Sequence, residues 1–188
     1  MRLSSTALRG AALAIVVTGA GCADTGSDEK AAVTTVTATP NTTAGAKTLE
    51  VIGDDYEYKG VPAKIAPGTV ISFTNASKRE VHELVAVRVK DGETRSTAEL
   101  LELPDEEGEK VTEFKGVAIA YPGEKAETPA GPLNLSQPGR YLFFCFIPTG
   151  ADPVAYKEAS SKATDGPPKV AGGPPHIKSG MLAEVTVG

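Results

Sequence analysis

From position 48 to the C-terminus, short stretches recur in which apolar and polar residues alternate, or in which β-branched and aromatic residues dominate. Glycines and prolines bound these stretches, which is the pattern of strands joined by turns. The pattern predicts strands at 49–52, 69–75, 81–89, 111–114, 117–121, 140–147 and 182–187. Short strands at this density predict an all-β fold, a Greek-key β-sandwich or barrel of about seven to eight strands.

Two segments have the pattern of short helices instead. Ser96 with Glu99 three residues later forms a capping box, which predicts a helix that ends before Pro104. Residues 154–163 predict a second helix, inside a stretch rich in Pro and Gly. The acidic run 105–109 lacks the alternating ligand spacing of a calcium loop, so it is predicted to be a solvated turn.

The N-terminus has the pattern of a bacterial export signal. Arg2 and Arg9 precede and flank an apolar run at 11–17 that is too short to span a membrane. Small residues then lead to Cys22, which resembles the lipobox of bacterial lipoproteins, although Gly19 stands where that motif usually has Leu. We therefore expect a signal peptide at 1–21, lipidation of Cys22, and a location on the extracytoplasmic face of a bacterial cell membrane. A plain secreted protein is the alternative.

Residues 22–47 are rich in Thr and Ala and show no apolar periodicity, which predicts a disordered tether. The folded domain is then expected at 48–188, and with 40% apolar residues the chain can form one ordinary core. The first 21 residues carry two basic and no acidic residues, so their removal leaves 17 basic against 24 acidic, a net charge of −7. This mildly acidic balance argues against nucleic acid as a partner.

Few residues in the predicted domain can carry chemistry. Residues 48–188 contain one cysteine, two histidines and one methionine: Cys145, His82, His176 and Met181. A mononuclear type 1 copper site uses two imidazoles, one thiolate and a weak axial thioether, and this inventory supplies that set. Zinc could use the Cys and both His, but the Met favours copper. A multicopper oxidase needs many more histidines, and no phosphate loop or nucleophile elbow is present, so an enzyme is not expected.

The flanking segments of these residues resemble those of cupredoxins, the blue-copper family. Residues 66–75 (APGTVISFTN) are similar to the family's strand before the first His, and 138–145 (PGRYLFFC) to its approach to the thiolate. The segment from His176 to Met181 resembles its closing His-x-x-x-Gly-Met. The resemblance implies a cupredoxin-like fold, copper held by His82, Cys145, His176 and Met181, and electron transfer with a redox partner protein that the sequence does not name. The alternatives are a cell-surface copper carrier or buffer, and a metal-free cupredoxin-like interaction module.

One departure from the family is the distance between the second and third proposed ligands. They usually lie a few residues apart, whereas here the insertion 146–175 separates Cys145 from His176. Closing a loop of this length costs only about 1–2 kcal/mol of additional entropy, so we expect His176 still to reach the same metal as Cys145. The insertion is expected to lie over the copper edge as a lid or a partner surface.

Overall fold

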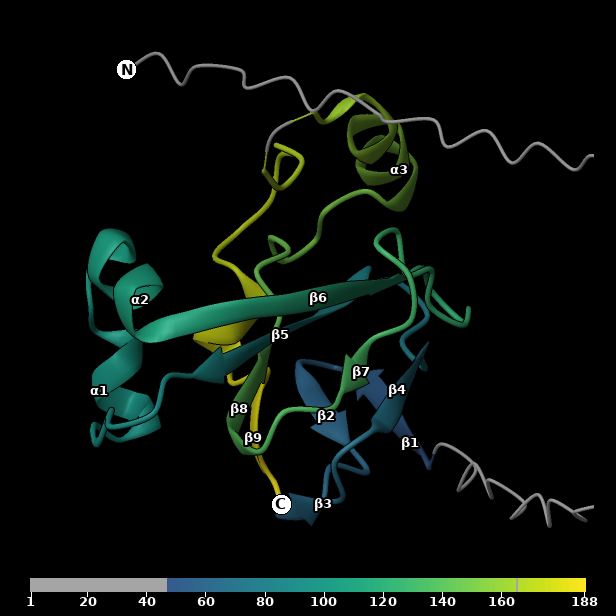
Figure 1. Cartoon of the computed structure of the whole chain (residues 1–188). Coiled ribbons are helices and arrows are strands. Elements are labelled where there is room, and N and C mark those ends of the chain that lie inside the picture. Colours follow the sequence, from purple (N-terminus) through teal and green to yellow (C-terminus); the bar gives the residue numbers. More distant parts are fainter. Residues whose placement is uncertain (1–46, 165) are drawn as a thin grey trace, which may run out of the picture. The chain divides into compact units, whose positions relative to one another are not determined.

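The computed structural model describes residues 47–164 and 166–188, which belong to one compact unit. The predicted signal peptide, Cys22 and the tether up to residue 46 lie outside the described residues. Two β-sheets make up most of this unit (Figure 1). None of the described helices is both long enough and apolar enough to cross a membrane.

The first sheet has four strands in the order β2-β1-β4-β7, and the second has five in the order β3-β9-β8-β5-β6. The strands of the first sheet are β1 (Thr48–Asp54), β2 (Glu57–Lys59), β4 (Thr69–Asn75) and β7 (Asn134–Leu135). Those of the second are β3 (Lys64–Ile65), β5 (His82–Val89), β6 (Thr112–Ala120), β8 (Gly139–Phe144) and β9 (Leu182–Val187). The chain crosses between the sheets after β2, β3, β4, β6 and β7. The expected all-β Greek-key sandwich is confirmed.

The core lies between the two sheets because the alternating apolar residues of both turn inward. In β4 the buried positions alternate with more exposed ones, so Ile71 and Phe73 point into the core together with Val51 of β1. Leu84 and Phe143 face them from the second sheet, both fully buried. Removal of this apolar surface from water is the main term that stabilises the fold.

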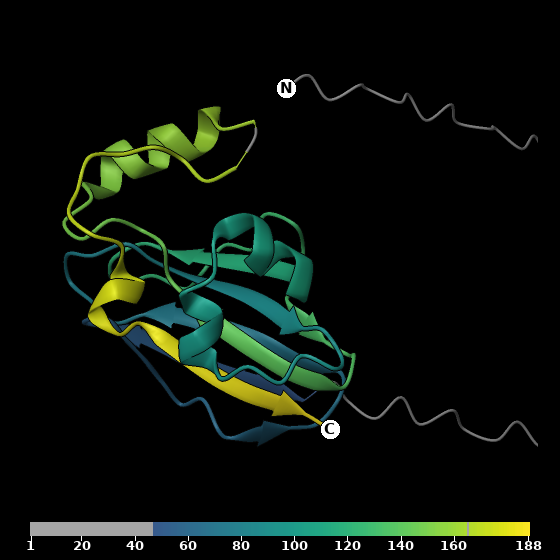
Figure 2. The same ribbon diagram turned by 90° about the vertical axis from the view of Figure 1, so that its left-hand side faces the viewer.

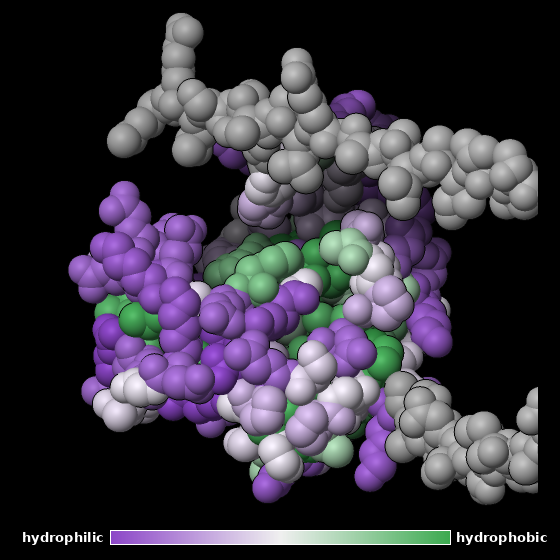
Figure 3. Space-filling view, in the orientation of Figure 1, coloured by the Kyte–Doolittle hydropathy of each residue, from purple (hydrophilic) through white to green (hydrophobic). Residues whose placement is uncertain are grey.

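A second apolar cluster lies on the outer face of the second sheet. Helix α1 (Thr97–Leu101) begins at the predicted capping box of Ser96 and Glu99, and its Leu100 packs against Val87 and Val89 of β5. Helices α1 and α2 (Asp105–Val111) therefore lie at the end of β5 that is farthest from His82 (Figures 1 and 2). The surface in this region is strongly hydrophilic, whereas hydrophobic residues gather along the middle of β6 (Figure 3).

The structure corrects several sequence predictions. The acidic run 105–109 is not a turn but the start of α2, where three acidic residues in the first turn interact favourably with the helix dipole. The two strands predicted at 111–114 and 117–121 are one strand, β6, because the pairing with β5 continues on both sides of a register shift at Lys115, from Ala86 with Gly116 to Val87 with Phe114. Strand β8 ends at Phe144 rather than at 147, and the short strands β2, β3 and β7 were not predicted.

Candidate metal centre

The topology of the second sheet brings the four predicted ligands to one end of it. His82 is the first residue of β5, Cys145 follows the last residue of β8, and Met181 precedes β9. Since β8 runs antiparallel to both β5 and β9, the end of β8 lies beside the starts of its two neighbours. His176 begins a short 3-10 helix, His176–Ser179, that leads into β9.

The insertion closes on itself at its base, and this closure brings His176 back to Cys145. We call residues 148–149 and 172–175 the neck of the insertion. The Thr149 N–H donates to the Pro174 carbonyl at 3.0 Å, and the Gly173 N–H donates to the Thr149 carbonyl at 2.8 Å. The two sides of the neck are so close that a Cβ on Gly172 would lie 2.5 Å from Cβ of Pro148. The insertion itself, with α3 (Pro153–Lys162), extends beyond this neck (Figure 2).

Three donor atoms converge beneath the neck. Nδ1 of His176 lies 3.2 Å from Nδ1 of His82 and 3.3 Å from Sγ of Cys145. One ligand atom from each of the three residues falls within 4.8 Å of the others, and all three residues are 0% exposed. The expectation that His176 approaches Cys145 despite the insertion is confirmed.

Met181 is buried in the same region. It is 0% exposed and belongs to the apolar cluster that surrounds Cys145, together with Val81 and Ile147. Its methyl group reaches toward β1, where a Cβ on Gly53 would lie 3.1 Å from Cε of Met181. The Met181 N–H donates to the carbonyl of His176 at 3.2 Å, so the two residues are held together through their backbone.

Burial sets the protonation of the three donors. It lowers the pKa of His82 to about 4, helped by the nearby His176. Burial also lowers the pKa of His176, although Glu80 acts in the opposite direction. Both imidazoles are therefore neutral at pH 7, the form that binds metals. Burial and the neighbouring Glu83 raise the pKa of Cys145 to about 12, so without a metal it is a thiol.

The sulfur also has hydrogen-bond donors directed at it. The Glu83 N–H donates to Sγ of Cys145 at 3.4 Å, and a backbone hydrogen bond from Ile147 likewise favours the thiolate. The Glu83 side chain is 5% exposed, and its Oε1 accepts the Phe146 N–H at 2.9 Å. Burial raises the pKa of this carboxyl to about 7. The sequence offered a signal for Glu83, an acidic residue that interrupts the valine face of its strand, but not for its contact with Phe146.

The turn before His82 is supported by Asn75, which sequence reasoning treated only as the end of a strand. Asn75 is 1% exposed, and its Nδ2 donates to the carbonyls of Glu80 at 2.8 Å and Ala120 at 2.9 Å. Its Oδ1 accepts the Ser77 N–H at 2.9 Å. These bonds hold the segment that leads from β4 to His82.

The cluster fits a metal better than it fits an ordinary core. Nδ1 of His82 and Nδ1 of His176 face each other at 3.2 Å, and Nε2 of His82 has no hydrogen-bond partner among the described residues. Burying two imidazoles and a thiol in this way costs free energy unless something satisfies their lone pairs. Two imidazoles, one thiolate and a nearby thioether are the donor set of a type 1 copper site. The fold and the clustering of His82, Cys145 and His176 are thus those that the cupredoxin resemblance implied.

Comparisons with known proteins give distant structural likenesses. No protein-family model matches the chain, and no curated protein matches it. A dithionite-reduced auracyanin from Roseiflexus castenholzii is similar over 77% of this chain and 99% of its own, at 19% identity and a TM-score of 0.42. Auracyanin A, a "blue" copper protein from Chloroflexus aurantiacus, is similar over 77% of this chain and all of its own, at 16% identity and a TM-score of 0.42.

A multi-copper oxidase from Pediococcus acidilactici is similar over 77% of this chain but only 27% of its own, at 9% identity and a TM-score of 0.37. All of these likenesses are too distant to assign a function. The function of this protein is therefore inferred from the geometry of the cluster.

Proposed function

We propose that this protein binds one copper ion through His82, Cys145, His176 and Met181 and acts as an electron-transfer protein. The observation that carries the proposal is the convergence of two imidazole nitrogens and one sulfur, at 3.2 and 3.3 Å, from three fully buried residues. Copper bound there would cycle between Cu(I) and Cu(II), taking up and releasing one electron. His82, His176 and Cys145 would be the stronger ligands, and Met181 would add a weak thioether ligand.

The chain's own residues supply what such a site needs. The apolar cluster around Cys145 and Met181 excludes water from the donors. The hydrogen bonds across the neck and the strands of the second sheet hold the donors in place, so that little rearrangement accompanies a change in oxidation state. The backbone N–H of Glu83 stabilises negative charge on the sulfur.

Complete burial of the donors favours electron transfer over the other candidate roles. A carrier or buffer must release copper, and release from beneath the neck requires the insertion to open. A catalytic metal keeps an open position for substrate, whereas His82, Cys145 and His176 are each 0% exposed. The proposed role is therefore that of an electron carrier and not an enzyme.

The proposed location comes from the N-terminal sequence alone. A lipid on Cys22 would attach the protein to the extracytoplasmic face of the bacterial membrane, with the tether carrying the domain. A redox protein in the same compartment would be its partner, and the mildly acidic chain suits a neutral or basic one. No nucleic acid is involved in this role.

Addition of one equivalent of Cu(II) to the purified protein tests the function. A thiolate bound to Cu(II) in a trigonal plane gives an intense visible charge-transfer band. Cys145→Ser should abolish this band, and Cys22→Ser, which alters the other cysteine of the chain, should leave it unchanged. Met181→Leu should keep the colour and raise the reduction potential, because loss of the axial donor favours Cu(I).

The proposal fails if the protein stays colourless and gives tetragonal Cu(II) signals in electron paramagnetic resonance that Cys145→Ser does not change. A metal-free interaction module would then be the better account of the fold.

A further inference from the structure

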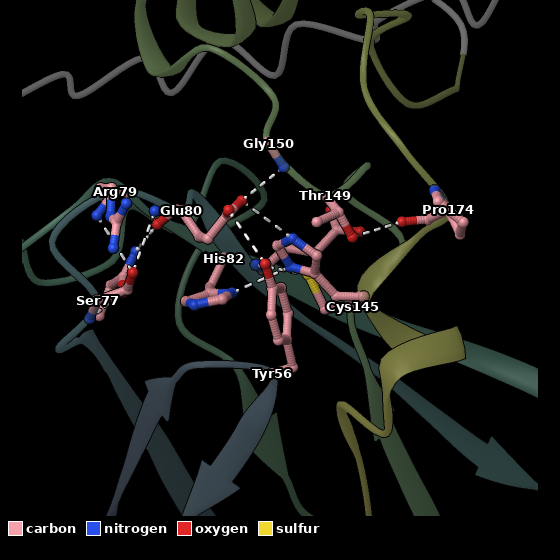
Figure 4. Close-up of polar contacts among 12 residues, drawn as sticks. Tyr56, Ser77, Arg79, Glu80, His82, Cys145, Thr149, Gly150 and Pro174 are labelled. Atoms are coloured by element: carbon pink, nitrogen blue, oxygen red, sulfur yellow. Dashed lines mark hydrogen bonds and ion pairs between the residues drawn. The ribbon is translucent and has the colours of Figure 1, made fainter.

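Glu80 lies beside the candidate metal centre, although no sequence pattern indicated a role for it. It stands two residues before His82, in the turn between β4 and β5, and its side chain is only 16% exposed. Its Oε2 lies 3.3 Å from Nε2 of His176, at ion-pair distance although without the alignment of a directed hydrogen bond. The carboxylate is therefore next to Nε2 of His176, whereas Nδ1 of the same ring faces Cys145 and His82. Figure 4 shows the Glu80 carboxylate between Tyr56 and Gly150.

Other contacts hold this carboxylate in place. Oε2 also accepts the N–H of Gly150, in the insertion, at 2.9 Å, and Oε1 accepts the hydroxyl of Tyr56 at 3.2 Å. The backbone of Glu80 is held as well, because its N–H donates to Oγ of Ser77 at 3.1 Å and its carbonyl accepts from Asn75 at 2.8 Å. These contacts fix both oxygens of the carboxylate and the backbone of Glu80, so the side chain is held in one orientation.

The Tyr56 ring also contacts His176. The two rings meet edge to face with centroids 4.8 Å apart. Tyr56 and Glu80 thus both contact His176, in addition to Cys145 and His82. This leaves little freedom for the imidazole to rotate.

The orientation of His176 determines where its proton must be. Nδ1 of His176 faces Sγ of Cys145 and Nδ1 of His82, so it can donate a lone pair there only if the ring proton is on Nε2. The group nearest to that proton is the carboxylate of Glu80. A carboxylate on the outer nitrogen of a metal-bound imidazole fixes its tautomer and makes it a stronger donor.

We propose that Glu80 is a positioning residue that keeps His176 in its ligating tautomer and lowers the reduction potential of the copper site. This inference rests on the proposed function. The negative charge of Glu80 stabilises the oxidised site more than the reduced site, because Cu(II) carries one more positive charge than Cu(I). Loss of that charge weakens binding of Cu(II) more than binding of Cu(I).

The main test compares the parent protein with Glu80→Gln. The glutamine keeps the shape, but it has one acceptor oxygen where the glutamate has two, and it has no charge. Loss of such a partner weakens metal binding about 10- to 100-fold. If Cu(II) affinity falls and Cu(I) affinity is unchanged, the reduction potential rises by about 59 mV for each tenfold loss.

Glu106→Gln is the matched control. It removes the same charge from the exposed face of α2, which lies beyond the far end of β5 from His82, and it should leave the potential unchanged. Glu80→Asp keeps the charge but withdraws it by one methylene group. Its potential should lie between those of the parent and Glu80→Gln, which keeps the test available if the glutamine variant does not fold.

A second readout needs no copper. Long-range proton–nitrogen spectra of the histidine rings in the metal-free protein should show His176 protonated at Nε2 in the parent and a mixture of tautomers in Glu80→Gln. A blue parent protein whose potential and His176 tautomer are the same as those of Glu80→Gln would overturn the role of Glu80 and leave the proposed function standing. A parent protein without the thiolate band would overturn the proposed function, and the redox role of Glu80 with it.

Discussion

Substitution of Asn75 tests whether a buried amide holds the turn that leads to the metal centre. Asn75 is 1% exposed and makes three hydrogen bonds, to the carbonyls of Glu80 and Ala120 and from the N–H of Ser77. Each such bond contributes about 1 kcal/mol, so Asn75→Ala should lower the free energy of unfolding by about 3 kcal/mol. The carbonyl of Ala120 would also be left buried without this donor.

Asn75→Asp sharpens this test because it keeps the shape of the side chain. The aspartate can still accept from Ser77, but it places an oxygen against two carbonyl oxygens where the asparagine places a donor. At pH 7 it should therefore destabilise the protein at least as much as Asn75→Ala. A simple loss of packing would instead make the aspartate the milder change.

Urea unfolding of the metal-free protein measures both variants. Asn134→Ala is the matched control, because Asn134 is exposed on β7, and it should change the free energy of unfolding by no more than about 0.5 kcal/mol. A loss below about 1 kcal/mol for Asn75→Ala, or one equal to that of the control, would refute the reasoning. The turn would then be held by other contacts.

The neck of the insertion, the buried titratable groups and the N-terminus each lead to a further prediction. Gly172→Ala should lower the free energy of unfolding by about 1–3 kcal/mol and speed hydrogen exchange across the neck. Gly173→Ala should do neither, because its Cβ would make an ordinary 3.5 Å contact. Equal exchange rates in the two variants would contradict this. In the metal-free protein the pKa of His82 is about 4 in place of 6.5, so stability should fall as the pH drops from 6.5 to 4. Glu83 has a pKa of about 7 in place of 4.5, so its protonation stabilises the folded protein as the pH drops and partly offsets the effect of His82. Glu83→Gln should therefore make the urea midpoint depend more steeply on pH. An unchanged slope would contradict this. Cys22→Ala should release the protein from the membrane fraction or leave it unprocessed, and normal processing with retention on the membrane would exclude the anchor.

Much of the fold and of the site could be predicted because the relevant signals are local. Strands β4 and β9 were predicted with their observed bounds, since alternation and flanking Gly or Pro depend only on neighbouring residues. The donor inventory needed no geometry, because residues 48–188 contain no other Cys, His or Met than the four proposed ligands. The capping box of α1 is likewise a local pattern of two residues, Ser96 and Glu99.

Other features depend on partners that are distant along the chain. Strand β6 is continuous because its pairing with β5 resumes after a register shift at Lys115, and this pairing cannot be seen in the residues around Lys115. The role of Glu80 depends on His176 and on Gly150, which lie far from it in sequence. In both cases the deciding contacts exist only after the sheets have formed.

The sequence by itself determined the β periodicity of this protein and the set of donor atoms available to a metal. Only the tertiary structure decided that Cys145 and His176, separated by the insertion 146–175, meet at 3.3 Å. The reason is that the cost of closing a loop grows slowly with its length, so spacing alone neither forbids nor requires the contact. The hydrogen bonds between Thr149 and the stretch 173–174 favour the contact, because they join the two sides of the insertion at its base.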